Sequence, residues 1–296
     1  MRTSLWLVLP LALVLAACGG GDDEAPVASS DPDPDGEKKI YTGVGTVLES
    51  PQHGPQLCLG GIATSYPPQC GGPDIEGWSW EDVDGHETAN GTTWGTYVVT
   101  GHYDGARFTL TEQAAAAADT TPVPGDQPPE PDFSTPCPEP AGGWTVVDES
   151  KATQAALDET LERASAEADY AGAWVDQSIN PAMDDGLDDD DELAMNDPTM
   201  MILNVRFTGD LDRHETELRE LWGGSLCVSQ AENTEAELRE IQESLDVPGM
   251  LSSGVDVKSG ALEVSVILDD GLQQQLDEQY GTGKVKVYSA LTEVTS

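Results

Sequence analysis

Alternation of apolar and polar positions dominates residues 40–112. Residues 40–48 and 94–102 alternate and are rich in β-branched side chains, which is typical of strands with one buried face. Asp104-Gly105 predicts a tight turn into a further strand at residues 107–111. Short strands separated by Gly- and Pro-rich loops indicate a small all-β barrel.

After residue 137 the apolar positions take helical spacing. Ala156, Leu157, Leu161 and Ala164 would share one face of a helix at residues 148–169. The chain then alternates between short apolar runs and amphipathic stretches. These predict strands at 170–176, 200–207 and 226–228 and helices at 212–222 and 235–245.

The end of the chain repeats this pattern at a constant offset, without a gap. Residues 203–207 match residues 262–266, and four further identities keep the same offset: Asp210/Asp269, Gly224/Gly283, Val228/Val287 and Ala231/Ala290. Each copy would be strand, strand, helix, strand, with one sheet face under its helix. The predicted class is therefore α+β.

Two polar segments lack any apolar period, residues 18–39 and residues 113–136, and they predict a disordered tether and a Pro/Ala-rich linker. The predicted organisation is a signal peptide at 1–17, the tether at 18–39, the barrel at 40–112, the linker at 113–136 and the α+β repeat domain at 137–296. Residues 98–105, Val-Val-Thr-Gly-His-Tyr-Asp-Gly, resemble the closing strands of OB-type barrels.

The N-terminal apolar run, residues 5–15, follows Arg2 and has the layout of a secretory signal peptide. It ends in Leu15-Ala16-Ala17-Cys18, which resembles the lipobox of bacterial lipoproteins. That resemblance implies cleavage before Cys18, a diacylglycerol on its thiol, and an acyl chain such as palmitate on its new amine. The protein would be anchored on the extracytoplasmic face of the cell membrane. The alternative is a chance Cys after an ordinary signal peptide.

The charge balance is strongly acidic. The chain has 55 Asp and Glu against 13 Lys and Arg, a net charge of −42. Such a field repels phosphates, so nucleic-acid binding is excluded as a function class. The acidic side chains either keep the surface heavily hydrated or attract cations and basic partners.

With Cys18 assigned to lipid, four cysteines remain. An even number in an exported chain predicts disulfides, and the local choice is Cys58–Cys70, which leaves Cys137–Cys227. A zinc site is the rival, but CxxC spacing and nearby His pairs are missing.

Aromatic residues cluster in a Pro- and Gly-rich loop of the barrel. Tyr66, Trp78 and Trp80, with Trp94 on a strand, could form a ligand patch, or they could fill the barrel core. Three histidines of the same region, His53, His86 and His102, could form a metal or acid–base site or stay exposed in loops.

The densest charge run, Asp184 to Glu192, could collect Ca²⁺ loosely, but it lacks the alternating spacing of a dedicated loop. We therefore predict a solvated insertion and leave Ca²⁺ binding open. No catalytic or nucleotide motif occurs in the chain. We predict that the protein is not an enzyme and has no cofactor and no dedicated metal.

Residues 170–176, with residues 255–266, resemble the prosegments of secreted α-lytic and streptogrisin-type proteases. The resemblance implies strands paired with small helices and a role as folding aid or inhibitor of a protease. The leading expectation is a lipid-anchored binding or structural module with an envelope protein or other ligand as partner. A prosegment-like inhibitor or chaperone is the alternative, and an envelope hydrolase is the second alternative.

Overall fold

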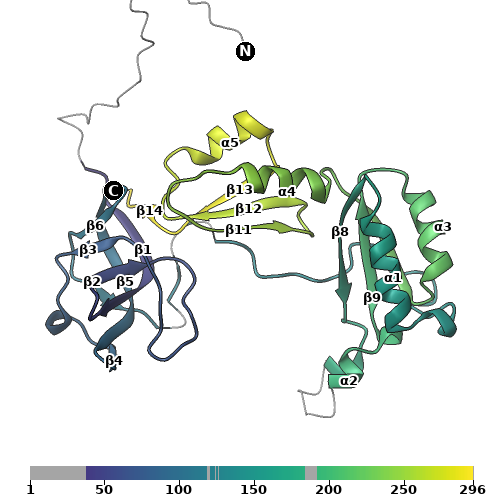
Figure 1. Cartoon of the computed structure of the whole chain (residues 1–296), viewed down its shortest axis with the longest axis horizontal. Coiled ribbons are helices and arrows are strands. Elements are labelled where there is room, and N and C mark those ends of the chain that lie inside the picture. Colours follow the sequence, from purple (N-terminus) through teal and green to yellow (C-terminus); the bar gives the residue numbers. More distant parts are fainter. Residues whose placement is uncertain (1–37, 119–120, 124, 126, 184–191, 296) are drawn as a thin grey trace, which may run out of the picture. The chain divides into compact units, whose positions relative to one another are not determined.

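The computed structural model describes residues 38–118, 121–123, 125, 127–183 and 192–295. A strand-rich sheet precedes two units of mixed helices and strands, so the predicted α+β class is confirmed (Figure 1). Within these residues, no helix has the length and apolar character needed to cross a membrane.

Five strands of the first sheet close into a barrel. They are β1 (Tyr41–Ser50), β2 (His53–Cys58), β3 (Asp74–Glu76), β5 (Thr92–Tyr103) and β6 (Arg107–Leu110). The order is β1-β2-β3-β6-β5, and β5 returns to pair with β1. Only the β3–β6 pair in this ring is parallel. This closed ring has the strand order of an OB-like barrel, as the sequence predicts.

Alternation along β1 and β5 decides which side chains enter the barrel. Val47, Tyr97 and Val99 are fully buried, and they pack around Phe108 from β6. Gly101 permits β5 and β6 to approach closely, because a Cβ there would lie 2.1 Å from the carbonyl oxygen of Thr109. Two short strands, β4 (Glu87–Ala89) and β7 (Ala115–Ala116), extend the sheet by pairing with β5.

The end of the chain completes the barrel. Strand β14 (Thr292–Glu293) pairs antiparallel with the start of β1. Leu291 is only 1% exposed and belongs to the same core cluster as Tyr41 and Phe108. The first sheet therefore takes in residues from beyond the 40–112 range that the sequence indicates.

The remaining strands and most helices form two copies of one unit. The first contains α1 (Gln154–Ser165), β8 (Tyr170–Asp176), β9 (Ile202–Phe207), α3 (Leu211–Leu221) and β10 (Ser225–Gln230). The second contains α4 (Glu235–Ser244), β11 (Met250–Asp256), β12 (Ala261–Val266), α5 (Leu272–Tyr280) and β13 (Val285–Ser289). Each copy is thus helix, strand, strand, helix, strand. The short α2 (Glu192–Met195) lies between β8 and β9.

The two copies agree down to their backbone hydrogen bonds. In each sheet the middle strand pairs antiparallel with the first strand and parallel with the last. The Ala231 amide donates to the Phe207 carbonyl, and at the equivalent position of the second copy the Ala290 amide donates to the Val266 carbonyl. The predicted repeat is therefore present in the fold. The helices predicted at residues 148–169 and 235–245 open the two copies, so each copy has one more helix than the predicted strand, strand, helix, strand unit.

Each sheet buries one face under its helices. Phe207 and Trp222 are fully buried in the first core, and Leu238 and Val264 in the second. Thr153 and Thr234 cap the leading helices in the same way, because each side chain accepts a hydrogen bond from the amide three residues on.

A segment that the sequence predicts as linker lies on the other face of the first sheet. We call residues 132–137 the strap. The Thr135 amide donates to Asp176 Oδ2 at 2.7 Å, and the Trp174 indole donates to the Phe133 carbonyl at 3.0 Å. Cys137 at its end is joined to Cys227 on β10. Trp174 and Cys227 lie in register with Asn204, so they share the face opposite the helices.

Candidate functional site

Trp78 and Trp80, two of the predicted ligand contacts, lie together against the barrel core. Their rings meet edge to face at 5.2 Å, and Trp78 also packs on the buried Tyr97 ring at 4.8 Å. The Trp80 indole nitrogen donates to Glu49 Oε2 at 2.6 Å. Both rings are partly buried and pack on the core cluster. Burial raises the pKa of Tyr97, and the charge of Asp84 raises it further.

Tyr66, the third predicted contact, lies apart from this pair. It is 72% exposed, and its ring meets that of Trp94 edge to face at 5.5 Å. No ring contact joins it to Trp78 or Trp80 in the described part of the chain. The structure therefore brings together two of the three predicted residues.

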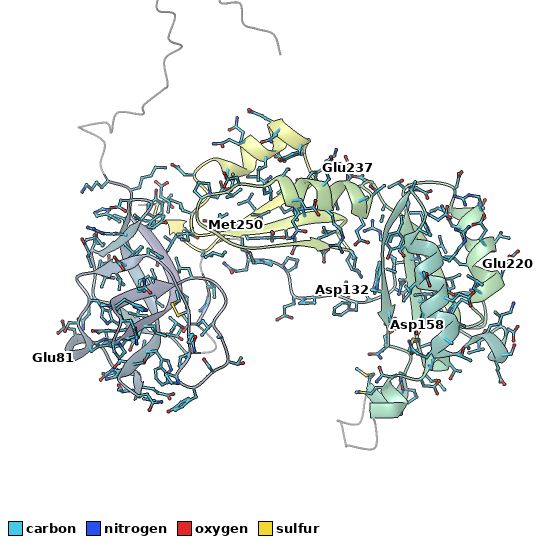
Figure 2. The ribbon with its side chains drawn as sticks, in the orientation of Figure 1. Glu81, Asp132, Asp158, Glu220, Glu237 and Met250 are labelled. Atoms are coloured by element: carbon cyan, nitrogen blue, oxygen red, sulfur yellow. A yellow bond between two sulfur atoms is a disulfide. The ribbon has the colours of Figure 1, made fainter. Side chains whose placement is uncertain are left out.

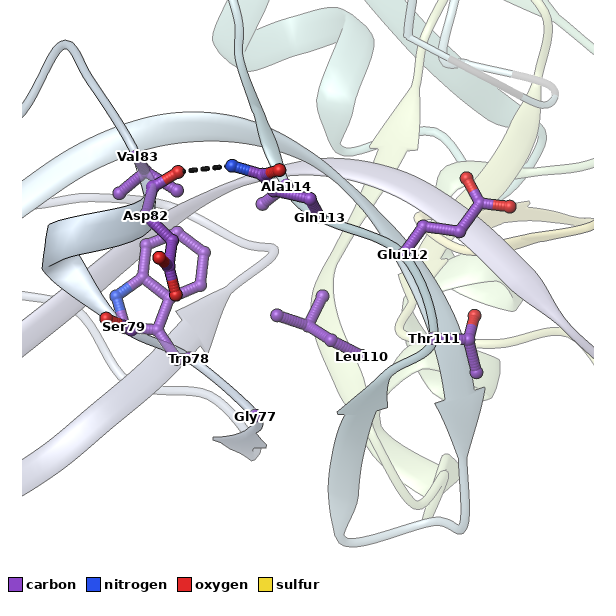
Figure 3. Close-up of a pocket in the computed structure, with 10 residues that line it drawn as sticks. All are labelled: Gly77, Trp78, Ser79, Asp82, Val83, Leu110, Thr111, Glu112, Gln113 and Ala114. Atoms are coloured by element: carbon purple, nitrogen blue, oxygen red, sulfur yellow. Dashed lines mark hydrogen bonds between the residues drawn. The ribbon is translucent and has the colours of Figure 1, made fainter.

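A cavity of about 430 Å³ opens beside Trp78 (Figure 3). Its apolar lining residues are Trp78, Val83, Leu110 and Ala114, and its acidic lining residues are Asp82 and Glu112. The Gln113 amide donates to the Asp82 carbonyl at 2.6 Å and so joins two walls of the cavity. The Trp78 indole nitrogen is buried and has no hydrogen-bond partner in the described structure.

Sequence reasoning missed most of this cavity. Asp82 follows the predicted aromatic loop, whereas Glu112 and Gln113 lie where the predicted barrel, residues 40–112, meets the predicted linker. The β3–β6 pairing brings the two segments together, because each follows one of these adjacent strands. A polar residue directly after a strand was the only signal, and many surface residues share it.

The three barrel histidines do not converge. His53 contacts the Gly54 carbonyl, His102 contacts the Lys39 carbonyl, and His86 packs against the Trp80 ring. Among the described residues, the one group of potential metal ligands that comes together is instead in the first repeat. Glu167, Asp169 and His214 each place a ligand atom within 4.8 Å of the others.

Arg213 already supplies a cation to this group. His214 is 1% exposed, its ring stacks on Phe207 at 3.6 Å, and its Nε2 lies 2.8 Å from Asp169 Oδ2. Arg213 places Nη2 3.0 Å from the same His214 nitrogen and Nη1 3.2 Å from Glu167. A divalent ion at this point would meet the guanidinium charge, so the arrangement fits an ion-pair network better than a metal site.

The pKa values of the network follow from its contacts. The hydrogen bond from Arg163 lowers the pKa of Glu167, and Arg213 adds to the effect. Burial acts to raise the pKa of Asp169, but the hydrogen bond and charge of His214 leave it below its ordinary value. The hydrogen bond to Glu217 raises the pKa of Arg213. The network therefore joins α1 and α3 by charges that persist at neutral pH.

The second repeat has the same architecture without this network. Gln273 stands at the position equivalent to His214, and it accepts a hydrogen bond from the Val287 amide while donating to the Val285 carbonyl. Different side chains thus fasten helix to sheet at equivalent positions. We assign the His214 network a role in stability. We take the Trp78 cavity as the candidate functional site because it adjoins the aromatic loop in which the sequence predicts ligand contacts.

Both predicted disulfides, Cys58–Cys70 and Cys137–Cys227, are present in the structure. Cys58 lies at the end of β2, so the first bond holds the loop that carries Tyr66. Cys18 and residues 184–191 of the acidic run lie outside the described residues, and so do the side chains at the run's end. Lipidation and Ca²⁺ binding there stay predictions.

Trp80→Ala should lower the free energy of unfolding by about 3 kcal/mol, because it removes a ring packed on the barrel core and leaves Glu49 without its donor. Trp80→Phe keeps a ring and should lose about 1 kcal/mol. Urea denaturation of the full chain measures both. For Trp80→Ala, a loss below about 0.5 kcal/mol, the range of ordinary surface substitutions, would instead favour Trp80 as an exposed ligand contact.

No protein-family model matches the chain, and a comparison with curated proteins finds no match either.

Proposed function

We propose that the protein is an exported lipoprotein, anchored through Cys18 on the extracytoplasmic face of the cell membrane, and that it serves there as a binding module. The lipobox at Leu15-Ala16-Ala17-Cys18, directly after an apolar run, carries this proposal. A lipid of two or three acyl chains would hold the protein stably, since each buried methylene contributes about 0.8 kcal/mol.

Two features of the fold support the proposal. Both disulfides suit an oxidising compartment outside the cytoplasm. The Trp78 cavity gives the barrel a concave surface with both apolar and polar side chains, and small ligands usually bind to concave surfaces.

Cys18→Ala should abolish incorporation of labelled palmitate and move the protein from the membrane fraction to the soluble fraction. The reason is that the substitution removes the thiol that would carry the diacylglycerol and breaks the lipobox, which implies both cleavage before Cys18 and acylation of the new amine. Membrane fractionation of cells fed the labelled fatty acid measures both outcomes. The matched control is Cys58→Ala/Cys70→Ala, which removes two other thiols and should keep the label. Equal label in Cys18→Ala and the unmodified protein would refute anchoring at Cys18.

The alternative is a prosegment-like inhibitor or chaperone. The resemblance implies strands paired with small helices, and both repeats have that arrangement. Inhibition of a streptogrisin-type serine protease by the full chain at micromolar concentration would favour it. An envelope hydrolase is the second alternative, and a broad esterase and peptidase screen addresses it.

A further inference from the structure

The Trp78 cavity joins an aromatic ring to carboxylates without a basic side chain in its lining. We propose that it binds a small organic cation, an amine or quaternary ammonium group with an apolar body. This inference rests on the proposed binding function and names the ligand class for that site.

The shape and apolar surface suit such a ligand. A volume of about 430 Å³ accommodates a small molecule, and Trp78, Leu110 and Ala114 offer apolar contact. Asp82 lines the same cavity as Trp78 (Figure 3). An indole face attracts a cation through its quadrupole, and the attraction grows when the cation is desolvated.

The charge of the cavity lining decides whether a cation, an anion or a neutral molecule binds there. Asp82 and Glu112 would both repel an anion, while a neutral sugar would gain nothing from their charges. None of the three basic residues at 38–112, Lys38, Lys39 and Arg107, lines the cavity. Lys39 pairs with Asp270 and Glu293, and Arg107 pairs with Glu76.

The wider surface adds to this bias. Acidic side chains occur on every part of the described chain, among them Glu81 on the barrel, Asp158 on the first repeat and Glu237 on the second (Figure 2). A net charge of −42 raises the local concentration of cations near the protein. The cavity then selects cations that also carry an apolar body.

The test is calorimetric titration of the full chain, in detergent, with choline chloride and with 3,3-dimethylbutanol, its uncharged isostere. Choline should bind, and the isostere should bind about tenfold more weakly or not at all, because it loses both the Coulomb and the cation–π attraction. Acetate and N-acetylglucosamine should not bind. The indole N–H resonance of Trp78 should shift with choline and reach saturation.

Variants in which two carboxylates are replaced by neutral amides test whether choline binds in this cavity. Asp82→Asn/Glu112→Gln should weaken choline binding about tenfold. Asp74→Asn/Glu87→Gln makes the same charge change at exposed barrel positions outside the cavity and should change the affinity less than about twofold.

Several outcomes would overturn the proposal. They are no binding of choline, equal binding of the isostere, binding of N-acetylglucosamine alone, or an equal loss in the two double variants, which would indicate a diffuse surface field. Palmitate labelling at Cys18 is measured separately, so anchoring can stand when cation binding fails.

Discussion

Leu291→Ala is expected to lower the free energy of unfolding of the barrel by about 3 kcal/mol. Leu291 follows both repeats and is far in sequence from Leu110, where the last strand of the barrel ring ends, yet it is 1% exposed and packs in the barrel core. Truncation of a buried Leu loses its transfer free energy and leaves a cavity. The substitution would therefore destabilise the barrel although it changes no residue of the segment 40–112 in which the sequence predicts that barrel.

Urea denaturation of the full chain, followed by tryptophan fluorescence, measures this loss. Val294→Ala is the matched control, because Val294 is 46% exposed on the same terminal segment and should change stability by less than about 0.5 kcal/mol. Equal effects of the two substitutions would mean that the end of the chain does not complete the barrel core.

The parts of the fold that the sequence predicts are those with a regular pattern. Alternation along residues 40–48 and 94–102 predicts β1 and β5, because a strand with one buried face repeats every second residue. The constant offset between the two copies predicts the second repeat, because equivalent positions in β9 and β12 have the same burial except at Asn204 and Glu263. At most of these positions the apolar residues of the sequence pattern are the ones that the structure buries.

Long-range contacts have no such pattern. The terminal residues 290–296, Ala-Leu-Thr-Glu-Val-Thr-Ser, are mostly polar, and a single Leu among them gives no sign that it enters a distant core. The strap stands at the end of a Pro-rich polar segment, residues 113–136, whose composition indicates a linker. Its place on the sheet comes from hydrogen bonds to Asp176 and Trp174, which no local spacing reveals.

The candidate site also has a part that the sequence predicts and a part that it does not. The two tryptophans stand in a loop of unusual aromatic content, and this composition drew attention to them before the fold was known. Glu112 and Gln113 reach the cavity only because β3 and β6 are neighbours in the barrel. The two strands are distant in sequence, and the sequence of either one alone does not reveal that they pair.

Cys137→Ser/Cys227→Ser should lower the free energy of unfolding by about 4 to 5 kcal/mol, and Cys58→Ser/Cys70→Ser by about 3 kcal/mol. A disulfide removes chain entropy from the unfolded state, and the removed amount grows with the closed loop. The cysteines are 90 residues apart in the first pair and 12 in the second. Urea denaturation of the two double variants under identical conditions gives the difference.

The Cys137–Cys227 bond also holds the strap, so its loss should have a local effect. Without it the strap keeps the hydrogen bond from the Thr135 amide to Asp176 and the contacts of Lys258 with Asp132 and Ser134. Burial acts to raise the pKa of Asp176, but hydrogen bonds led by that from Ser178 leave it lower than usual, so this acceptor stays charged at neutral pH. We expect the Thr135 amide to exchange about tenfold faster, which corresponds to about 1.4 kcal/mol of local stability.

Hydrogen exchange read at Thr135 separates this local effect from global destabilisation. Cys58→Ser/Cys70→Ser leaves the strap bond intact, and its Thr135 amide should keep its protection under native conditions. Unchanged protection of Thr135 after loss of Cys137–Cys227 would show that side-chain contacts alone hold the strap. The disulfide would then stabilise the protein only by restricting the unfolded chain. A bond that also restrains the folded strap must slow hydrogen exchange at the Thr135 amide, so its loss would have to speed that exchange.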